Sequence, residues 1–231
     1  SVTGDNSLNS YEDRDIDSVT LTEAGQLNHE GHSGATLDGA NCQIYDRFKN
    51  QKVIDIIAGQ GTPDVITLHL GTNDFGLQNP ADSAEGAFAE MKQLLYLLNG
   101  ACDSSATDEW KASVGTPLYP NATIFVAKII PRADSGLMTN KIGPFNNLLA
   151  TYVTSLASDK LVLVDLGMAC NYGLLRHDGL HPSTEGYSRM AQNWFANIEA
   201  VLPPKDADAS IATVDARVAN TLKVTTNKAI D

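Results

Sequence analysis

The C-terminal third of the sequence contains an aspartate and a histidine separated by two residues, in the segment Asp178-Gly179-Leu180-His181-Pro182. When such a spacer folds into a turn, the carboxylate can accept a hydrogen bond from the imidazole Nδ1–H, which leaves Nε2 free to act as a general base. An exposed turn pair or a metal site would contain the same residue types. We favour the catalytic interpretation because the pair lies between an apolar run and a strongly amphipathic segment.

Two further segments contain groups able to donate hydrogen bonds to a developing oxyanion. Asn73 follows an apolar run in Gly71-Thr72-Asn73-Asp74, and its carboxamide is a suitable donor; an Asx-turn that caps the next helix is the alternative. Gly34 lies in Glu30-Gly31-His32-Ser33-Gly34-Ala35-Thr36, where glycines allow a backbone N–H to approach a ligand closely; an ordinary glycine loop is the alternative. Ser33 does not form a nucleophile elbow, because no apolar strand precedes it.

Other polar residues are candidates for contacts with ligands or for modification. His177 and Arg176 flank the Asp178 segment and Arg132 follows an apolar run, so all three are candidate substrate contacts, with plain solvation as the alternative. Asn121-Ala122-Thr123 is a sequon for N-glycosylation. The histidines at positions 29 and 32 lack metal-ligand spacing with any cysteine or carboxylate pair. The sequence therefore predicts neither a metal nor an organic cofactor.

Alternating strand and helix patterns surround these candidate residues. Three apolar runs, at residues 65–70, 123–130 and 161–166, predict buried parallel strands. Apolar spacings of three and four predict helices between and after them, at residues 88–98 with a stop at Gly100, at 142–156 and at 187–201, with a weaker helix at 37–48. This alternation predicts an α/β fold with a doubly wound parallel sheet, in which ligands bind beyond the carboxyl ends of the strands.

Length and composition narrow the possible classes of protein. A chain of 231 residues can form one sizeable α/β domain, which we place at residues 1–202, followed by a linker or C-terminal extension at 203–231 with a short strand at 222–225. A net charge of −12 argues against nucleic acid as a partner. No apolar run is long enough to span a membrane. Three cysteines allow one disulfide and leave one over.

The segments Ser33-Gly34-Ala35-Thr36, Gly71-Thr72-Asn73-Asp74 and Asp178-Gly179-Leu180-His181-Pro182, followed by Gly186-Tyr187, resemble the SGNH (GDSL-type) hydrolases. The likeness is greatest to carbohydrate esterases that remove acetyl groups from xylan, and it covers roughly residues 29–202. It implies a three-layer, flavodoxin-like fold. It also implies that Gly34 and Asn73 form an oxyanion hole and that Asp178 and His181 complete a catalytic triad.

The third triad member of this family is the serine of a Gly-Asp-Ser motif on the first strand, and the sequence contains no such tripeptide. Gly4-Asp5-Asn6-Ser7 is a near match, but no apolar strand precedes it. We therefore expect the serine and the first strands to lie upstream of this chain or on another fragment. The resemblance implies a secreted serine esterase for acetylated polysaccharide. The alternatives are an inactive carbohydrate-binding or structural protein on the same scaffold, and an esterase or lipase for lipid esters.

Overall fold

The computed structural model describes residues 34–37, 43–59, 62–76 and 83–202, together with the backbone of two strands at 211–218 and 221–226. The chain forms two compact units. We call the first the sheet unit; it comprises Gly31–Ile129 and Asp134–Leu163. We call the second the turn unit; it comprises Ser1–Glu30, Ile130–Ala133 and Val164–Asp231.

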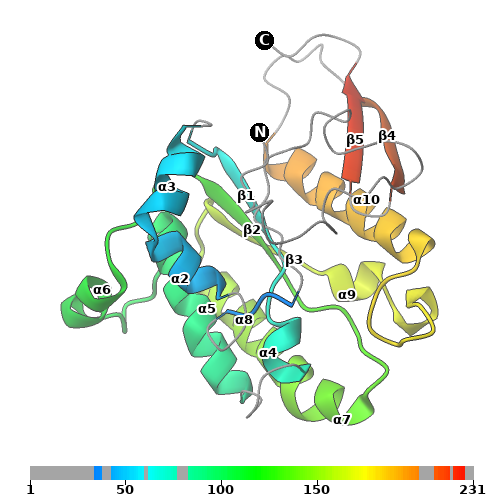
Figure 1. The fold of residues 1–231 in the computed structure, drawn as a ribbon, viewed down its shortest axis with the longest axis horizontal. Coiled ribbons are helices and arrows are strands. Elements are labelled where there is room, and N and C mark those ends of the chain that lie inside the picture. Colours follow the sequence, from blue (N-terminus) through cyan, green and yellow to red (C-terminus); the bar gives the residue numbers. More distant parts are fainter. Residues whose placement is uncertain are drawn as a thin grey trace. The chain divides into compact units, whose positions relative to one another are not determined.

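Three described strands form a sheet in the order β1-β2-β3, namely β1 (Val65–Leu68), β2 (Thr123–Ala127) and β3 (Leu161–Val164) (Figure 1). β1 and β2 run parallel, in a register that pairs Val65 with Thr123. Helices alternate with these strands along the chain. The α/β class and the parallel sheet predicted from the sequence are therefore confirmed.

Each strand begins where the sequence predicts and ends two or three residues earlier than predicted. For β2 the cause is visible at Ile129, which lies beyond the last strand residue. The Asn146 side chain accepts a hydrogen bond from Ile129 N at 2.9 Å and donates one to Ile129 O at 2.9 Å. A side-chain carboxamide thus takes the place of a neighbouring strand. The apolar run continues past the end of β2, but the backbone hydrogen bonding between strands does not.

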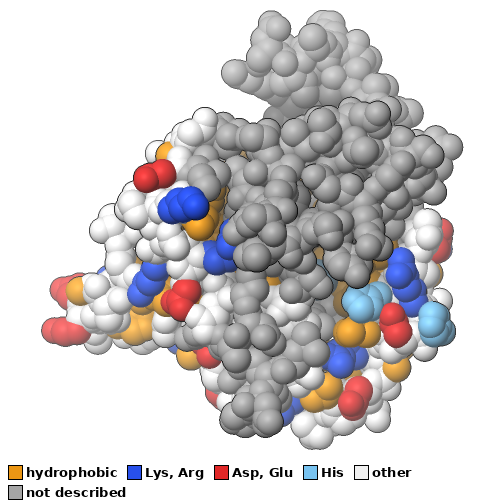
Figure 2. Space-filling model, in the orientation of Figure 1, with side chains coloured by type: hydrophobic (Ala, Val, Ile, Leu, Met, Phe, Trp, Pro, Cys, Tyr) orange, Lys and Arg blue, Asp and Glu red, His pale blue; other side chains and the backbone are white. Residues whose placement is uncertain are grey.

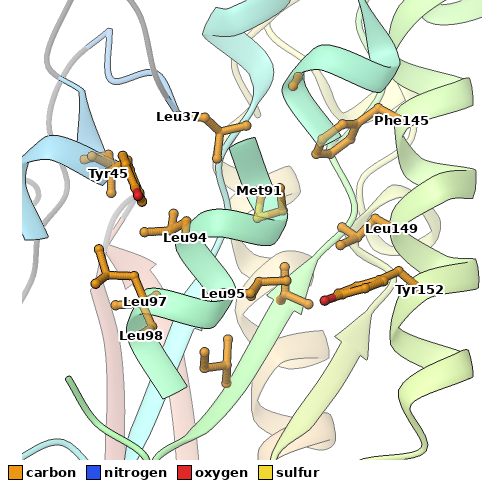
Figure 3. Packing of buried hydrophobic residues seen from close by; sticks show 14 of the residues in the cluster. Leu37, Tyr45, Met91, Leu94, Leu95, Leu97, Leu98, Phe145, Leu149 and Tyr152 are labelled. Atoms are coloured by element: carbon orange, nitrogen blue, oxygen red, sulfur yellow. The ribbon is translucent and has the colours of Figure 1, made fainter. Parts of the chain in front are cut away.

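The core of the sheet unit forms around α5 (Ala84–Asn99), which packs against β2 and α8 (Gly143–Leu156). Figure 3 shows Met91, Leu94, Leu95 and Leu98 of α5 directed into this core with Leu149 of α8. On β2, Ile124 and Val126 join the cluster, whereas Phe125 and Ala127 are fully buried outside it. Both faces of β2 are therefore covered, which explains why its sequence shows no polar alternation.

The long helices match the periodic patterns well. α5 has Ser83 as its N-cap and ends at Asn99, with Gly100 as the C-cap, so the predicted stop at Gly100 is confirmed. α8 follows a wide π-helical turn at Met138–Ile142 and covers most of the second predicted helix. The third predicted helix is α10 (Thr184–Val201), which begins three residues before the first residue of the apolar pattern.

The weak helix predicted at residues 37–48 was placed wrongly at its start. Thr36 forms a parallel bridge with Gln43, and Leu37 lies in a bend, so the helix α2 begins at Ile44 and ends at Lys49. Short helices that the sequence patterns did not predict also occur, namely α3 (Gln51–Ala58), α4 (Thr72–Gly76), α6 (Asp108–Val114) and α7 (Ser135–Leu137). Each is too short to show an apolar repeat of more than two turns.

The turn unit contains α9 (Leu166–Ala169), a 3₁₀ turn at Tyr172–Leu174 and the long helix α10. Beyond α10 the strands β4 (Ile211–Val218) and β5 (Thr221–Thr226) pair antiparallel as a hairpin, and β4 packs beside α10. β5 contains the short strand predicted within residues 203–231, whereas β4 was not predicted. Among the described helices, none combines the length and the apolar content needed to cross a bilayer.

Candidate active site

Asp178 and His181 lie in one tight turn and contact each other directly. The Asp178 Oδ2 atom is 2.9 Å from the His181 Nδ1 atom, as the spacing in the sequence predicts. The other carboxylate oxygen, Oδ1, accepts hydrogen bonds from the backbone N–H groups of Leu180 at 2.8 Å and His181 at 2.9 Å. The carboxylate therefore shapes the turn with one oxygen and orients the imidazole with the other.

These contacts also determine the charge of Asp178. The backbone N–H groups of His181 and Leu180, followed by the His181 side chain, hold the pKa of Asp178 well below its usual range. The carboxylate is therefore anionic at neutral pH. The side chains of His181 and Asp178 are 58% and 39% exposed, so the imidazole is open to an incoming reactant.

The turn is closed by a short antiparallel bridge between Leu175 and Pro182. Arg176 N donates to His181 O at 2.7 Å, and Ser183 N donates to Leu174 O at 2.7 Å. These backbone bonds fasten both ends of the segment that contains Asp178 and His181.

Two glycines allow this arrangement. Gly179 has φ +66°, and a Cβ atom on it would collide with Ala133, whose N–H donates to Gly179 O at 2.8 Å. Gly186 lies in the first turn of α10, where an added Cβ atom would be 2.5 Å from Leu174 O and 3.1 Å from the buried Cys170 Sγ. The N-terminus of α10 can therefore lie directly against the segment that holds the turn.

The two candidate oxyanion donors both lie in the sheet unit. Asn73 is on α4, and its Nδ2 donates to Ala35 O at 2.9 Å, which leaves the second amide hydrogen available to another acceptor. Gly34 precedes Ala35 and has φ +74°, so its backbone lies in the left-handed region. The Asn73 carboxamide therefore contacts the Gly34 loop across 38 residues of sequence, rather than serving only a local turn.

Asp74 is a functional candidate to which the sequence pattern assigned no role. Its side chain is fully buried, and Oδ1 accepts a hydrogen bond from Leu37 N at 2.8 Å. Asn73 and Asp74 thus bind two residues of the same loop from adjacent positions on α4. The only signal in the sequence was the pair of Asx residues after Gly71-Thr72, because the partner lies 37 residues away.

Replacement of Asp74 by alanine is expected to destabilise the sheet unit by about 1–3 kcal/mol, because the Leu37 N–H then lacks its acceptor. Urea unfolding measures the change. Asp74→Asn is the matched control, since its amide oxygen can still accept the bond, and it should recover most of the loss. Equal stability of wild type and Asp74→Ala would show that the contact does not hold the loop.

The remaining candidates are distributed over both units. Arg132 is half-buried beside Ala133, and His177 is exposed beside Asp178, so both belong to the unit that contains the turn. Asn121 is exposed in the turn before β2, where Lys160 Nζ lies 3.5 Å from its Oδ1.

Cys102 and Cys170 are free thiols, and Cys42 lies outside the described residues. In the described parts of the chain, no three His, Cys, Asp or Glu side chains gather as a metal site requires.

Sequence comparison decides the family. Residues 3–189 match the GDSL-like Lipase/Acylhydrolase family. The chain belongs to this family. A curated protein, a "Multidomain esterase" of Ruminococcus flavefaciens, is 23% identical over 203 residues, and the match covers 82% of this chain and 24% of that protein. The chain thus spans about a quarter of the length of this curated relative.

Solved structures place the GDSL chain in the same fold. A carbohydrate esterase family 3 protein of Talaromyces cellulolyticus is similar with a TM-score of 0.52 at 23% identity, over 76% of this chain and 72% of that one. A family 3 carbohydrate esterase of Clostridium thermocellum gives 0.52 at 24%, over 79% and 74%. A mutant acetyl esterase with an acetate ion gives 0.57 at 21%, over 83% and 80%. These likenesses establish the shared fold.

Proposed function

We propose that this chain is the catalytic domain of a serine esterase that removes acetyl groups from a polysaccharide such as xylan. The observation that carries the proposal is the 2.9 Å contact between Asp178 Oδ2 and His181 Nδ1, in a member of an acylhydrolase family. A carboxylate on Nδ1 leaves Nε2 unprotonated in the neutral imidazole, which is the form that a general base needs.

In the proposed reaction, His181 takes the proton of the nucleophilic serine as its oxygen attacks the acetyl carbonyl. Asp178 stabilises the imidazolium that forms, and the Gly34 N–H and Asn73 Nδ2–H donate to the oxyanion. The tetrahedral intermediate then breaks the bond to the sugar oxygen, which takes the proton from His181 and leaves as a free hydroxyl. Water, activated by the same imidazole, attacks the acetyl-enzyme and releases acetate with the free serine.

The substrate class is supported by the kinds of protein that share the fold. Two of the similar structures are family 3 carbohydrate esterases and a third is an acetyl esterase. Arg132 and His177, which lie in the same unit as Asp178 and His181, are proposed to contact the substrate. An esterase for an acetylated polymer needs only a small pocket for the acetyl group, but a long open surface for the polysaccharide. An esterase for lipid esters would need a large pocket for the acyl group and no such surface.

A substrate panel tests the proposal on the full protein that contains this domain. Acetate release from acetylated xylan is compared with hydrolysis of p-nitrophenyl acetate and p-nitrophenyl octanoate, after labelling of a parallel sample with a serine-reactive phosphonate. We expect turnover of both acetyl esters and one phosphonate adduct, whose peptide identifies the nucleophile. Preference for the octanoyl ester would support a lipid esterase instead. The absence of both turnover and a phosphonate adduct would support an inactive binding protein.

A further inference from the structure

Arg176 lies directly beside the proposed general base. Leu175 and Pro182 face each other in the antiparallel bridge. One residue nearer to the turn, Arg176 therefore lies opposite His181. Their backbones are joined by the 2.7 Å bond from Arg176 N to His181 O. Residues opposite each other in an antiparallel pair have neighbouring Cβ atoms on the same face. The guanidinium and the imidazole therefore start from the same side of the turn.

The charge of Arg176 is not neutralised within the part of the chain that the structure describes. No carboxylate there lies within ion-pair distance of its guanidinium. The Asp178 carboxylate is engaged by His181 and two backbone N–H groups, and Glu185 pairs with Arg189 at 2.8 Å. Arg176 is thus an exposed cation in a chain of net charge −12, and its backbone adjoins that of the proposed base.

An exposed aromatic side chain lies on the same segment. Tyr172 is 55% exposed in the 3₁₀ turn that leads into Leu174 and Leu175, and Met168 on α9 is 81% exposed. The segment is held against the catalytic turn by the bond from Ser183 N to Leu174 O. Figure 2 shows histidine, basic, acidic and apolar side chains together over α9 and the loop that follows it. A tyrosine in such a place offers an apolar ring face and a hydroxyl to a sugar.

We infer that Arg176 and Tyr172 bind a uronic acid residue close to the acetylated sugar, so that the substrate is an acetylated acidic polysaccharide. A guanidinium can donate two parallel hydrogen bonds to a carboxylate. The tyrosine ring would then cover one face of the sugar that carries this carboxylate. This inference rests on the proposed esterase function and specifies its substrate.

Steady-state kinetics test the inference with paired polymers. Acetylated glucuronoxylan is compared with xylan that lacks glucuronate and is acetylated to the same degree. We expect a KM about tenfold lower for the acidic polymer in the wild type, as a charge-assisted pair gives. Arg176→Gln should abolish the preference, and Tyr172→Ala should raise KM for both polymers.

Arg189→Gln is the matched control, because Arg189 is also an exposed arginine of the turn unit but is already paired with Glu185. It should keep the preference. A wild type that treats both polymers alike while hydrolysing p-nitrophenyl acetate would overturn the inference and leave the esterase function standing. Equal losses on all three substrates in Arg176→Gln would also overturn it, because they would indicate a structural role for Arg176.

Calorimetric binding separates this inference from the failure of the esterase function. Xylo-oligosaccharides without acetyl groups are titrated with and without a glucuronate branch, so that no turnover is required. Tighter binding of the branched sugar, lost in Arg176→Gln and weakened by salt, is expected. If that preference appears in a protein that hydrolyses no ester, the esterase proposal fails and the sugar site stands. Equal affinity for the two sugars contradicts the site itself.

Discussion

Replacement of Asp178 by asparagine is expected to lower kcat for ester hydrolysis by about 10³–10⁴-fold while the turn stays folded. Oδ1 of Asp178 accepts two backbone N–H bonds, so the asparagine oxygen must take that position. Its NH₂ group then faces His181 Nδ1 and donates to it. The imidazole is forced into the tautomer that has its proton on Nε2, and this tautomer cannot accept the proton of a serine.

The measurement is kcat and KM for p-nitrophenyl acetate, together with thermal unfolding. Asp134→Asn is a matched control. Like Asp178, Asp134 accepts a hydrogen bond from the backbone N–H three residues further along the chain, here Leu137 N at 3.0 Å, but it contacts no imidazole in the described structure. It should keep full activity. A kcat for Asp178→Asn within tenfold of wild type would mean that the carboxylate does not select the tautomer.

A second large effect is expected at Gly186, where alanine should destabilise the protein by about 2–4 kcal/mol. The added Cβ atom would lie 2.5 Å from Leu174 O, 3.0 Å from Pro182 Cβ and 3.1 Å from Cys170 Sγ. Leu174 O cannot retreat freely, because it accepts the bond from Ser183 N that helps to close the turn containing Asp178 and His181. The clash should therefore also lower activity.

Gly86→Ala separates this packing effect from helix propensity. Gly86 and Gly186 occupy the same position in their helices, and each donates its N–H to the N-cap serine, at 2.9 Å and 3.1 Å. Gly86 is only half-buried, whereas Gly186 is buried. Alanine ordinarily stabilises a helix by about 1 kcal/mol relative to glycine, so Gly86→Ala should be neutral or stabilising in urea unfolding. Similar changes in both variants would show that the close packing at Gly186 has no energetic consequence.

The sequence predicted those parts of the fold that depend on local patterns. The starts of β1, β2 and β3, the helices α5 and α10 and the stop at Gly100 follow from apolar spacing and single residues. The Asp178–His181 contact was predictable for the same reason, since its two partners are three residues apart.

The features that the sequence did not predict depend on contacts between distant residues. β2 ends early because Asn146 binds the backbone of Ile129, and Asp74 binds Leu37 across 37 residues. The sequence places Arg176 next to the segment that contains Asp178 and His181, but its pairing with His181 follows only from the bridge between Leu175 and Pro182. Such pairings follow from the tertiary fold, and local propensity does not encode them.

We propose that His181, oriented by Asp178, is the general base of an ester hydrolase. The most direct test is acetate release from acetylated xylan by the full protein, measured for wild type and for a His181→Ala variant with the same unfolding midpoint. We expect steady release by the wild type and a kcat at least about 10³-fold lower in the variant. Equal rates in the two proteins would contradict it.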